Sequence, residues 1–231
     1  MSDDRFRRSA WSVASVLAAL LVRAAAPAGQ REFEGVLTLS VSANGVHNDA
    51  TVYAKGGVFR VDPHRTVKGQ ASYLIVDTER ASATAVDRDA LSFITLPLPR
   101  EAAAAPLAGV RAVKAGTTTI AGVACEEWVY THDERTARLW VPLAGGAYTR
   151  PLPKPPLFSL PAERLKGDDR RFFRWVLADV AGKGFFPLKL SLAGERGDLE
   201  MEVRSIVERP VDASVFAVPA GYRNKDGGRS P

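Results

Sequence analysis

The sequence predicts a mainly β fold with a minor α part: a curved antiparallel sheet in the form of an incomplete barrel, covered by one helix and a proline-rich flap. Apolar and polar residues alternate with a period of two along most of the chain, and turn residues separate these runs. One stretch has apolar residues at helical spacing instead. A composition of 46% hydrophobic and 25% charged residues excludes a disordered chain.

The N-terminus has the features of an export signal. A basic start, MSDDRFRR, precedes a run of 12 apolar residues from Trp11 to Val22, and small residues then suit cleavage before Gly29. A helix that spans a bilayer needs roughly 20 apolar residues, which argues against a permanent transmembrane anchor. We therefore expect residues 1–28 to be a signal peptide and the mature protein to be periplasmic or secreted.

The export route is left open by the residues before the apolar run. A Sec signal peptide is the first expectation, and the pair Arg7-Arg8 also permits twin-arginine export of a folded chain. No cysteine lies near the cleavage site, so we expect no lipid anchor there.

Charge and cysteine content narrow the classes of protein further. The full chain carries +5, and removal of four basic and two acidic residues with the signal peptide leaves +3, too little for a nucleic-acid-binding surface. The only cysteine, Cys125, cannot form an internal disulfide, so the core must hold the fold. We expect residues 29–231 to form one domain.

The first elements are expected to be strands joined by tight turns. In residues 33–42, FEGVLTLSVS, leucines fall on one side and hydroxyl residues on the other. Asn44-Gly45 and Gly56-Gly57 are typical hairpin turns. We expect strands over 33–42, 49–55, 55–62 and, through two polar turns, several over 72–97.

The rest of the sheet follows an alanine- and proline-containing link over 97–112. Strands are expected over 117–122, 123–132, 136–142, 185–193 and 198–208. The total is about ten strands in sequential hairpins. A series of that length must curl into a barrel, a half-barrel or a sandwich to limit its exposed edges.

Two segments depart from the strand pattern. Residues 143–161 contain five prolines, a density that rules out a central strand and predicts an extended flap. Residues 168–182 predict a helix that covers the sheet, because Asp168 or Asp169 can cap its start and Gly182 can end it.

Four motifs occur in one order along the mature chain. They are Ile120-Ala121-Gly122 with Cys125, a strand bearing Trp140, Pro187 with Lys189, and a closing segment with Asp212, Ser214, Phe216, Val218, Pro219, Gly221 and Tyr222. In this order and spacing the chain resembles a family of exported bacterial proteins with a domain of unknown function, grouped with the LolA/LolB-like lipoprotein carriers.

The resemblance implies a fold and a kind of ligand. It implies a sheet bent into an incomplete barrel, with helix and loop material over its open side. In the related carriers that space holds acyl chains. The proline-rich flap of this chain departs from the family pattern.

Cys125 could in principle be a catalytic thiol, but its surroundings favour a structural role. His132 is seven residues along the same predicted strand, roughly 23 Å away at about 3.3 Å per residue and on the opposite face. Glu126 and Glu127 also fall on opposite faces. We therefore expect a buried, unreactive cysteine and no catalytic residues.

Other chemistry has little support in the sequence. His47, His64 and His132 lack the spacing of metal ligands, and no phosphate-binding loop or nucleophile elbow is present. We expect no metal site, no cofactor and no enzymatic activity.

The apolar helix face is the candidate ligand-binding surface, although such a face is more often ordinary core packing. The candidate residues are Trp140, Phe172, Phe173, Trp175, Val176, Leu177, Val180 and Phe185.

Three functions remain open from the sequence. The leading hypothesis is a periplasmic, non-enzymatic protein that binds a lipid, an acylated protein or another apolar ligand in the half-barrel. The second is an envelope interaction or sensor domain with a packed core and a protein partner. The third, an enzyme that depends on Cys125, has the least support.

Overall fold

The computed structural model describes residues 33–43, 46–65, 71–98, 107–143, 167–182, 187–194 and 197–225. The predicted signal peptide, residues 1–28, lies outside these ranges, as does the proline-rich flap except for Leu143.

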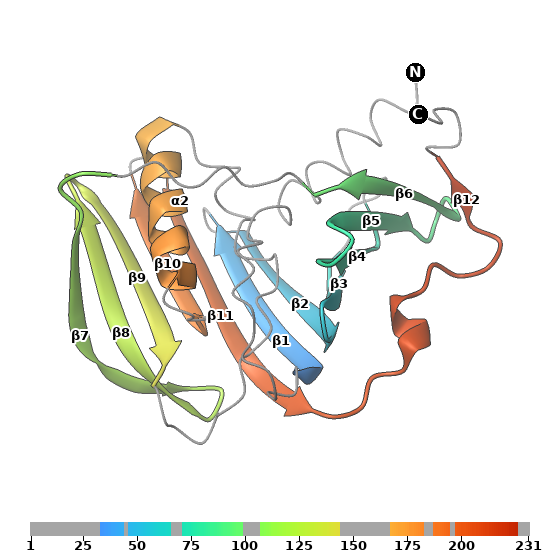
Figure 1. Ribbon diagram of the computed structural model, residues 1–231, viewed down its shortest axis with the longest axis horizontal. Coiled ribbons are helices and arrows are strands. Elements are labelled where there is room, and N and C mark those ends of the chain that lie inside the picture. Colours follow the sequence, from blue (N-terminus) through green and yellow to red (C-terminus); the bar gives the residue numbers. More distant parts are fainter. Residues whose placement is uncertain are drawn as a thin grey trace.

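The described strands form one open sheet, and its order is β12-β6-β5-β4-β3-β2-β1-β11-β10-β9-β8-β7 (Figure 1). A mainly β fold with one long helix confirms the predicted fold class. The strands are β1 (Glu34–Ala43), β2 (Val46–Lys55), β3 (Val58–Pro63), β4 (Tyr73–Asp77), β5 (Ser82–Asp87), β6 (Ser92–Pro97), β7 (Arg111–Ile120), β8 (Val123–His132), β9 (Arg135–Pro142), β10 (Lys189–Gly194), β11 (Gly197–Glu208) and β12 (Arg223–Asn224).

Two antiparallel meanders make up the sheet. Strands β1 to β6 form the first and β7 to β11 the second, and each strand pairs with its neighbour in the chain. The meanders join where β1 pairs antiparallel with β11, from Gly35 opposite Glu208 to Ala43 opposite Leu199. Local sequence patterns do not predict this pairing, because its partners lie at opposite ends of the chain.

The structure extends two of the sequence expectations. Strand β7 begins at Arg111, within the segment predicted to be a link, and the short β12 adds a parallel partner to β6. Twelve strands therefore replace the expected ten or so.

Glycine positions explain the hairpin turns. Ala121 and Gly122 have φ values of 48° and 79° between β7 and β8. Positive φ at both central residues defines a type I′ turn, whose twist suits a two-residue hairpin. The Ile120-Ala121-Gly122 motif of the resemblance is thus a turn signal rather than part of a chemical site.

In two polar loops an aspartate side chain stabilises the turn instead. Asp77 Oδ1 accepts from the backbone N–H of Arg80 at 2.8 Å, and Asp87 Oδ1 accepts from that of Ala90 at 3.0 Å. Aspartate at the start of a turn commonly satisfies backbone donors in this way. The two loops confirm the predicted turns and align β4, β5 and β6.

The inner face of the sheet, defined as the face that carries Leu37 and its cross-strand neighbours, holds the main core. Alternate residues of successive strands point to it and are buried. They include Leu37, Leu39, Val52, Ala54, Phe59, Val61, Leu74, Val76, Ala85, Ile94, Leu139, Leu190, Met201 and Val203.

A smaller core lies on the outer face, beneath the C-terminal strap, which we define as Val211–Lys225. Tyr73, Ile75 and Val86 are buried there, and Phe216, Val218 and Tyr222 of the strap pack against them. The closing motif of the resemblance therefore supplies a structural cover for β4 and β5.

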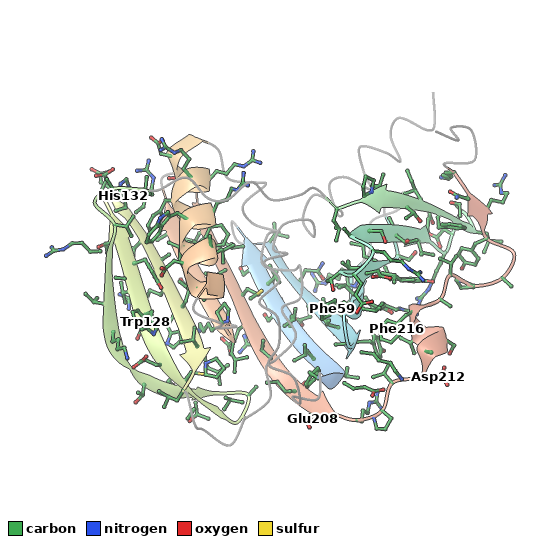
Figure 2. All side chains as sticks on the ribbon, in the orientation of Figure 1. Phe59, Trp128, His132, Glu208, Asp212 and Phe216 are labelled. Atoms are coloured by element: carbon green, nitrogen blue, oxygen red, sulfur yellow. The ribbon has the colours of Figure 1, made fainter. Side chains whose placement is uncertain are left out.

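Polar contacts hold the strap at two points. Glu34 Oε1 accepts from Val211 N at 2.8 Å, while Lys55 Nζ donates to Val211 O at 2.9 Å. The Val211 N–H, followed by Lys55, lowers the pKa of Glu34. Further along, Arg60 donates to Val215 O at 3.1 Å. Figure 2 shows Asp212 and Phe216 of the strap at the end of the sheet away from the long helix.

The junction of the two meanders can be tested by truncating one inner-face side chain. Leu37 is 0% exposed, so Leu37→Ala should lower the free energy of unfolding by about 2–5 kcal/mol. Val207 follows Ile206, the β11 partner of Leu37, and is 50% exposed. Val207→Ala should therefore change the free energy of unfolding by less than about 0.5 kcal/mol. Urea unfolding would compare the variants, and equal losses would contradict the assigned faces.

Candidate functional site

Helix α2 (Gly167–Gly182) lies over the inner face beside β9 (Figure 1). The sequence predicted it over 168–182, and the structure confirms that range to within one residue. Asp168 and Asp169 in its first turn favour the helix because carboxylates interact well with the free N–H groups there.

One side of α2 is fully apolar and buried. Its residues recur three or four positions apart and are all part of the main core. They are Phe172, Phe173, Val176, Leu177 and Val180, each no more than 5% exposed. Arg171 is exposed, so the helix has the amphipathic character that the sequence indicates.

Aromatic rings of β8 lie against this helix. The rings of His132 and Phe172 stack at 6.0 Å between centroids, and those of Tyr130 and Trp175 meet edge-on at 6.3 Å. Trp128 stacks on Tyr130 at 6.4 Å. Figure 2 shows Trp128 and His132 on the strands beside α2.

A buried ion pair fixes the start of the helix. Arg135 Nε donates to Asp169 Oδ1 at 2.6 Å, and the two side chains are 14% and 9% exposed. Arg135 also lies 3.7 Å from Asp133 in the β8–β9 turn. Because a lone buried charge is costly, removal of either partner should loosen this end of α2.

A second polar contact lies near the other end of the helix. Tyr130 donates its hydroxyl proton to Asp179 Oδ2 at 2.9 Å. Burial, helped by the Asp179 carboxylate, raises the pKa of Tyr130. Asp169 and Asp179 are ten residues apart, or about 15 Å along a helix. The two contacts therefore hold α2 to the β8–β9 hairpin over most of its length.

The structure brings together most of the predicted ligand-binding residues. Phe172, Phe173, Val176, Leu177 and Val180 lie in the core between α2 and the sheet, and Trp175 packs at its margin. Phe185 lies outside the described residues.

Trp140, another of the predicted residues, lies on strand β9. It lies between Leu139 and Val141, which face the core, so strand alternation directs it to the other face. There Lys189 Nζ lies 5.3 Å from the centre of its ring. Trp140 nevertheless packs against the main core as a partly buried residue, as Trp175 does.

Sequence reasoning missed a group of partly buried apolar residues on the inner face. These rim residues, Val41, Ala50, Leu96 and Ile206, pack against the main core but keep part of their surface exposed. Ile206 pairs with Leu37 and so shares its face. Strand alternation could have found them once the inner face was known.

The surroundings of Cys125 agree with a structural role. It is 0% exposed, its thiol lies 3.4 Å from Val123 O, and burial raises its pKa to about 11. The unbroken register between β8 and β9 puts Cys125 and His132 seven residues apart on one strand, on opposite faces.

The two glutamates after Cys125 make separate contacts on opposite faces of the strand. Glu126 accepts from Trp128 Nε1 at 3.0 Å and pairs with Lys114, while Glu127 pairs with Arg138 on the other face. They do not form an acid and base pair.

No group of three or more His, Cys, Asp or Glu residues is arranged to hold a metal ion in the part of the chain that the structure describes. Nor does any described helix have the length and apolar character to cross a membrane.

Comparison with known proteins gives a family and a set of distant structures. A model described as "Domain of unknown function (DUF4412)" matches residues 33–222. No curated protein matches the chain.

Among solved structures, an uncharacterized conserved protein from Thermus thermophilus matches with 11% identity and a TM-score of 0.46, over 83% of this chain and 90% of its own. MucB matches with 10% identity and a TM-score of 0.46, over 93% of this chain but only 64% of its own, less than two thirds. LprF from Mycobacterium bovis matches with 9% identity and a TM-score of 0.36, over 96% of this chain and 97% of its own.

The contribution of the Arg135–Asp169 ion pair to stability can be tested by substituting Asp169 and, as a control, the adjacent Asp168. Asp169→Ala should lower the free energy of unfolding by about 3–5 kcal/mol, because it leaves Arg135 as a buried charge without its main partner. Asp168→Ala, in the same turn but exposed, should cost only about 0.3–1 kcal/mol through the helix dipole. Similar losses in urea unfolding would show that the ion pair does not hold α2.

The thiol can be tested by its reaction with a disulfide reagent. The pKa of about 11 compares with an ordinary value of 9.0, so at pH 8 the folded protein should react at least ~100-fold more slowly than the urea-unfolded chain. The pKa of Cys125 is higher in the folded protein than in the unfolded chain. Its burial therefore contributes fully to the free energy of unfolding below pH 9, and this contribution is lost as the pH rises towards 11. Equal rates at pH 8 would contradict a buried thiol.

Proposed function

Since the chain belongs to the DUF4412 family, we propose that it is an exported, non-enzymatic binding protein of the cell envelope that holds a lipid, an acylated protein or another apolar ligand against the inner face of its sheet. Residues 1–28 direct its export in this proposal, and the mature domain acts in the periplasm or after secretion.

The observation that carries the proposal is the extent of the apolar inner face. The buried side chains continue from β9 through β11 and β1 to β6, whereas the described contacts of α2 with the sheet centre on β8 and β9. The rim residues lie on β1, β2, β6 and β11, beyond the helix. An apolar surface of this kind binds a ligand by excluding water, at roughly 25 cal/mol for each Å² buried.

An acyl chain suits this surface better than a polar ligand does. The inner-face positions of the central strands are occupied by leucine, valine, alanine and phenylalanine, with few groups able to direct a hydrogen bond. The resemblance to LolA/LolB-like carriers, whose half-barrels hold acyl chains, supports the same ligand class.

In this proposal α2 acts as a fixed wall rather than a freely moving lid. Its apolar residues Phe172, Phe173, Val176, Leu177 and Val180 face the core, and the contacts of Asp169 and Asp179 hold it to the β8–β9 hairpin. A ligand would enter past the rim residues, where apolar surface is exposed.

A second candidate function is an envelope interaction or sensor domain with a filled core. The continuity of the main core, in which α2 and strands of both meanders form one cluster of buried residues, favours it. Such a protein would bind a partner through its exterior and would carry no lipid.

Ligand binding can be tested with the purified full-length chain and cis-parinaric acid, a fluorescent fatty acid. We expect saturable binding, and Ile206→Gln should weaken it about tenfold because it adds a polar group to the rim of the inner face. Val207→Gln, a neighbour on the opposite face, should bind as the unmodified protein does.

The same preparation separates the two candidate functions. Organic extraction followed by mass spectrometry should release a lipid if the protein carries one. A protein that contains no lipid and gives no saturable parinaric acid signal would refute the binding proposal, and a stable protein partner in its place would support the interaction domain.

A further inference from the structure

The two edge strands of the sheet differ in whether a further strand pairs with them. At one edge, β12 covers part of β6, where Arg223 N donates to Leu91 O at 3.0 Å and Lys225 N to Phe93 O at 2.9 Å. At the other edge lies β7, and no described strand pairs with its outer side (Figure 1). An uncovered edge presents N–H and C=O groups to which another strand can add.

Strand β7 is long and is exposed over nearly its whole length. It spans ten residues, and all nine from Arg111 to Thr119 are exposed. The average strand in a globular protein has about five or six residues, so this edge is long enough for a stable pairing. Val113 is 56% exposed, although it is apolar.

Only the first half of β7 has features that discourage pairing. Arg111 and Lys114 lie there, and the register with β8 is irregular between Lys114 and Gly116. Charges and bulges are the usual means of protecting an edge. The second half, Gly116–Ile120, contains no charge and no proline but has three consecutive threonines, which favour strands.

Backbone geometry identifies the groups that point outward. Ile120 and Val123 flank the two-residue type I′ turn and form the pair that closes the hairpin. In an antiparallel ladder, alternate residues bond to the same neighbour, so Thr118 turns its N–H and C=O towards β8. Thr117 and Thr119 turn theirs towards the outer edge.

The charge of β7 indicates the chemistry of an added strand. Its sequence, RAVKAGTTTI, has two cations and no anion. Lys114 contacts two residues of the paired strand β8. Its Nζ lies 3.0 Å from Glu126 and 5.2 Å from the centre of the Trp128 ring. Strand β7 thus already pairs with an acidic strand along one edge.

We propose that the outer edge of β7 is a docking site for an extended, acidic segment of a partner polypeptide, which pairs antiparallel with Thr117–Thr119 and places its carboxylates near Arg111 and Lys114. Main-chain hydrogen bonds supply the contact, and the two cations select the partner and its direction. This site is separate from the inner face and does not depend on an apolar ligand.

The test uses the full chain and a labelled ten-residue peptide of alternating valine and threonine, with two glutamates in its C-terminal half. Fluorescence anisotropy should show saturable binding that weakens at least tenfold for the same peptide with lysine in place of glutamate. Arg111→Gln should weaken the glutamate peptide several-fold but leave a neutral serine version unchanged.

Two further variants test the strand pairing itself. Thr117→Pro removes an outward N–H and should weaken binding at least tenfold, whereas Thr117→Ser keeps the N–H and should bind normally. Circular dichroism would check that both are folded. As a measurement independent of folding, a peptide N-methylated on its pairing edge should not bind the unmodified protein.

Three outcomes would overturn the proposal. These are undiminished binding of the N-methylated peptide, undiminished binding to folded Thr117→Pro, and failure of the glutamate peptide to bind at all. If sedimentation showed instead that the chain dimerises without peptide and that Thr117→Pro prevents this, a second copy would be the occupant and the partner assignment would be wrong.

Discussion

The antiparallel pairing of β1 with β11 is the constraint on which the rest of the structure depends. It makes one sheet of two meanders, each of which could be assembled from neighbouring hairpins. Through it Leu37 and Leu39 of β1 join Met201 and Val203 of β11 in one core. The inner face is continuous across the molecule only because this ladder exists, and the proposed ligand surface lies across it.

Different elements cover the two faces of the sheet. On the inner face α2 and the aromatic side chains of β8 bury an apolar surface, and buried polar contacts hold the helix in place. On the outer face the C-terminal strap covers Tyr73, Ile75 and Val86. Because the strap is anchored on β1, β2 and β3, it adds a second support to the first meander from the outer face.

Local features of the structure could be predicted from the sequence, and long-range ones could not. Period-two alternation and glycine turns identified most hairpins, and helical spacing identified α2, because both depend on neighbouring residues. Burial of Cys125 followed from the same strand geometry. The start of β7 was missed since its alternation is weak. The pairs Arg135–Asp169 and Tyr130–Asp179 join residues 34 and 49 positions apart, beyond any local pattern.

The bond between Glu34 and Val211, 177 residues apart in the chain, bears on how the protein folds. Strand β1 is made first, but its partner β11 and the strap are made last, so the sheet cannot close until nearly the whole polypeptide has been synthesised. Contacts between residues so far apart raise the contact order and slow this closing step, because a long loop must close before they form.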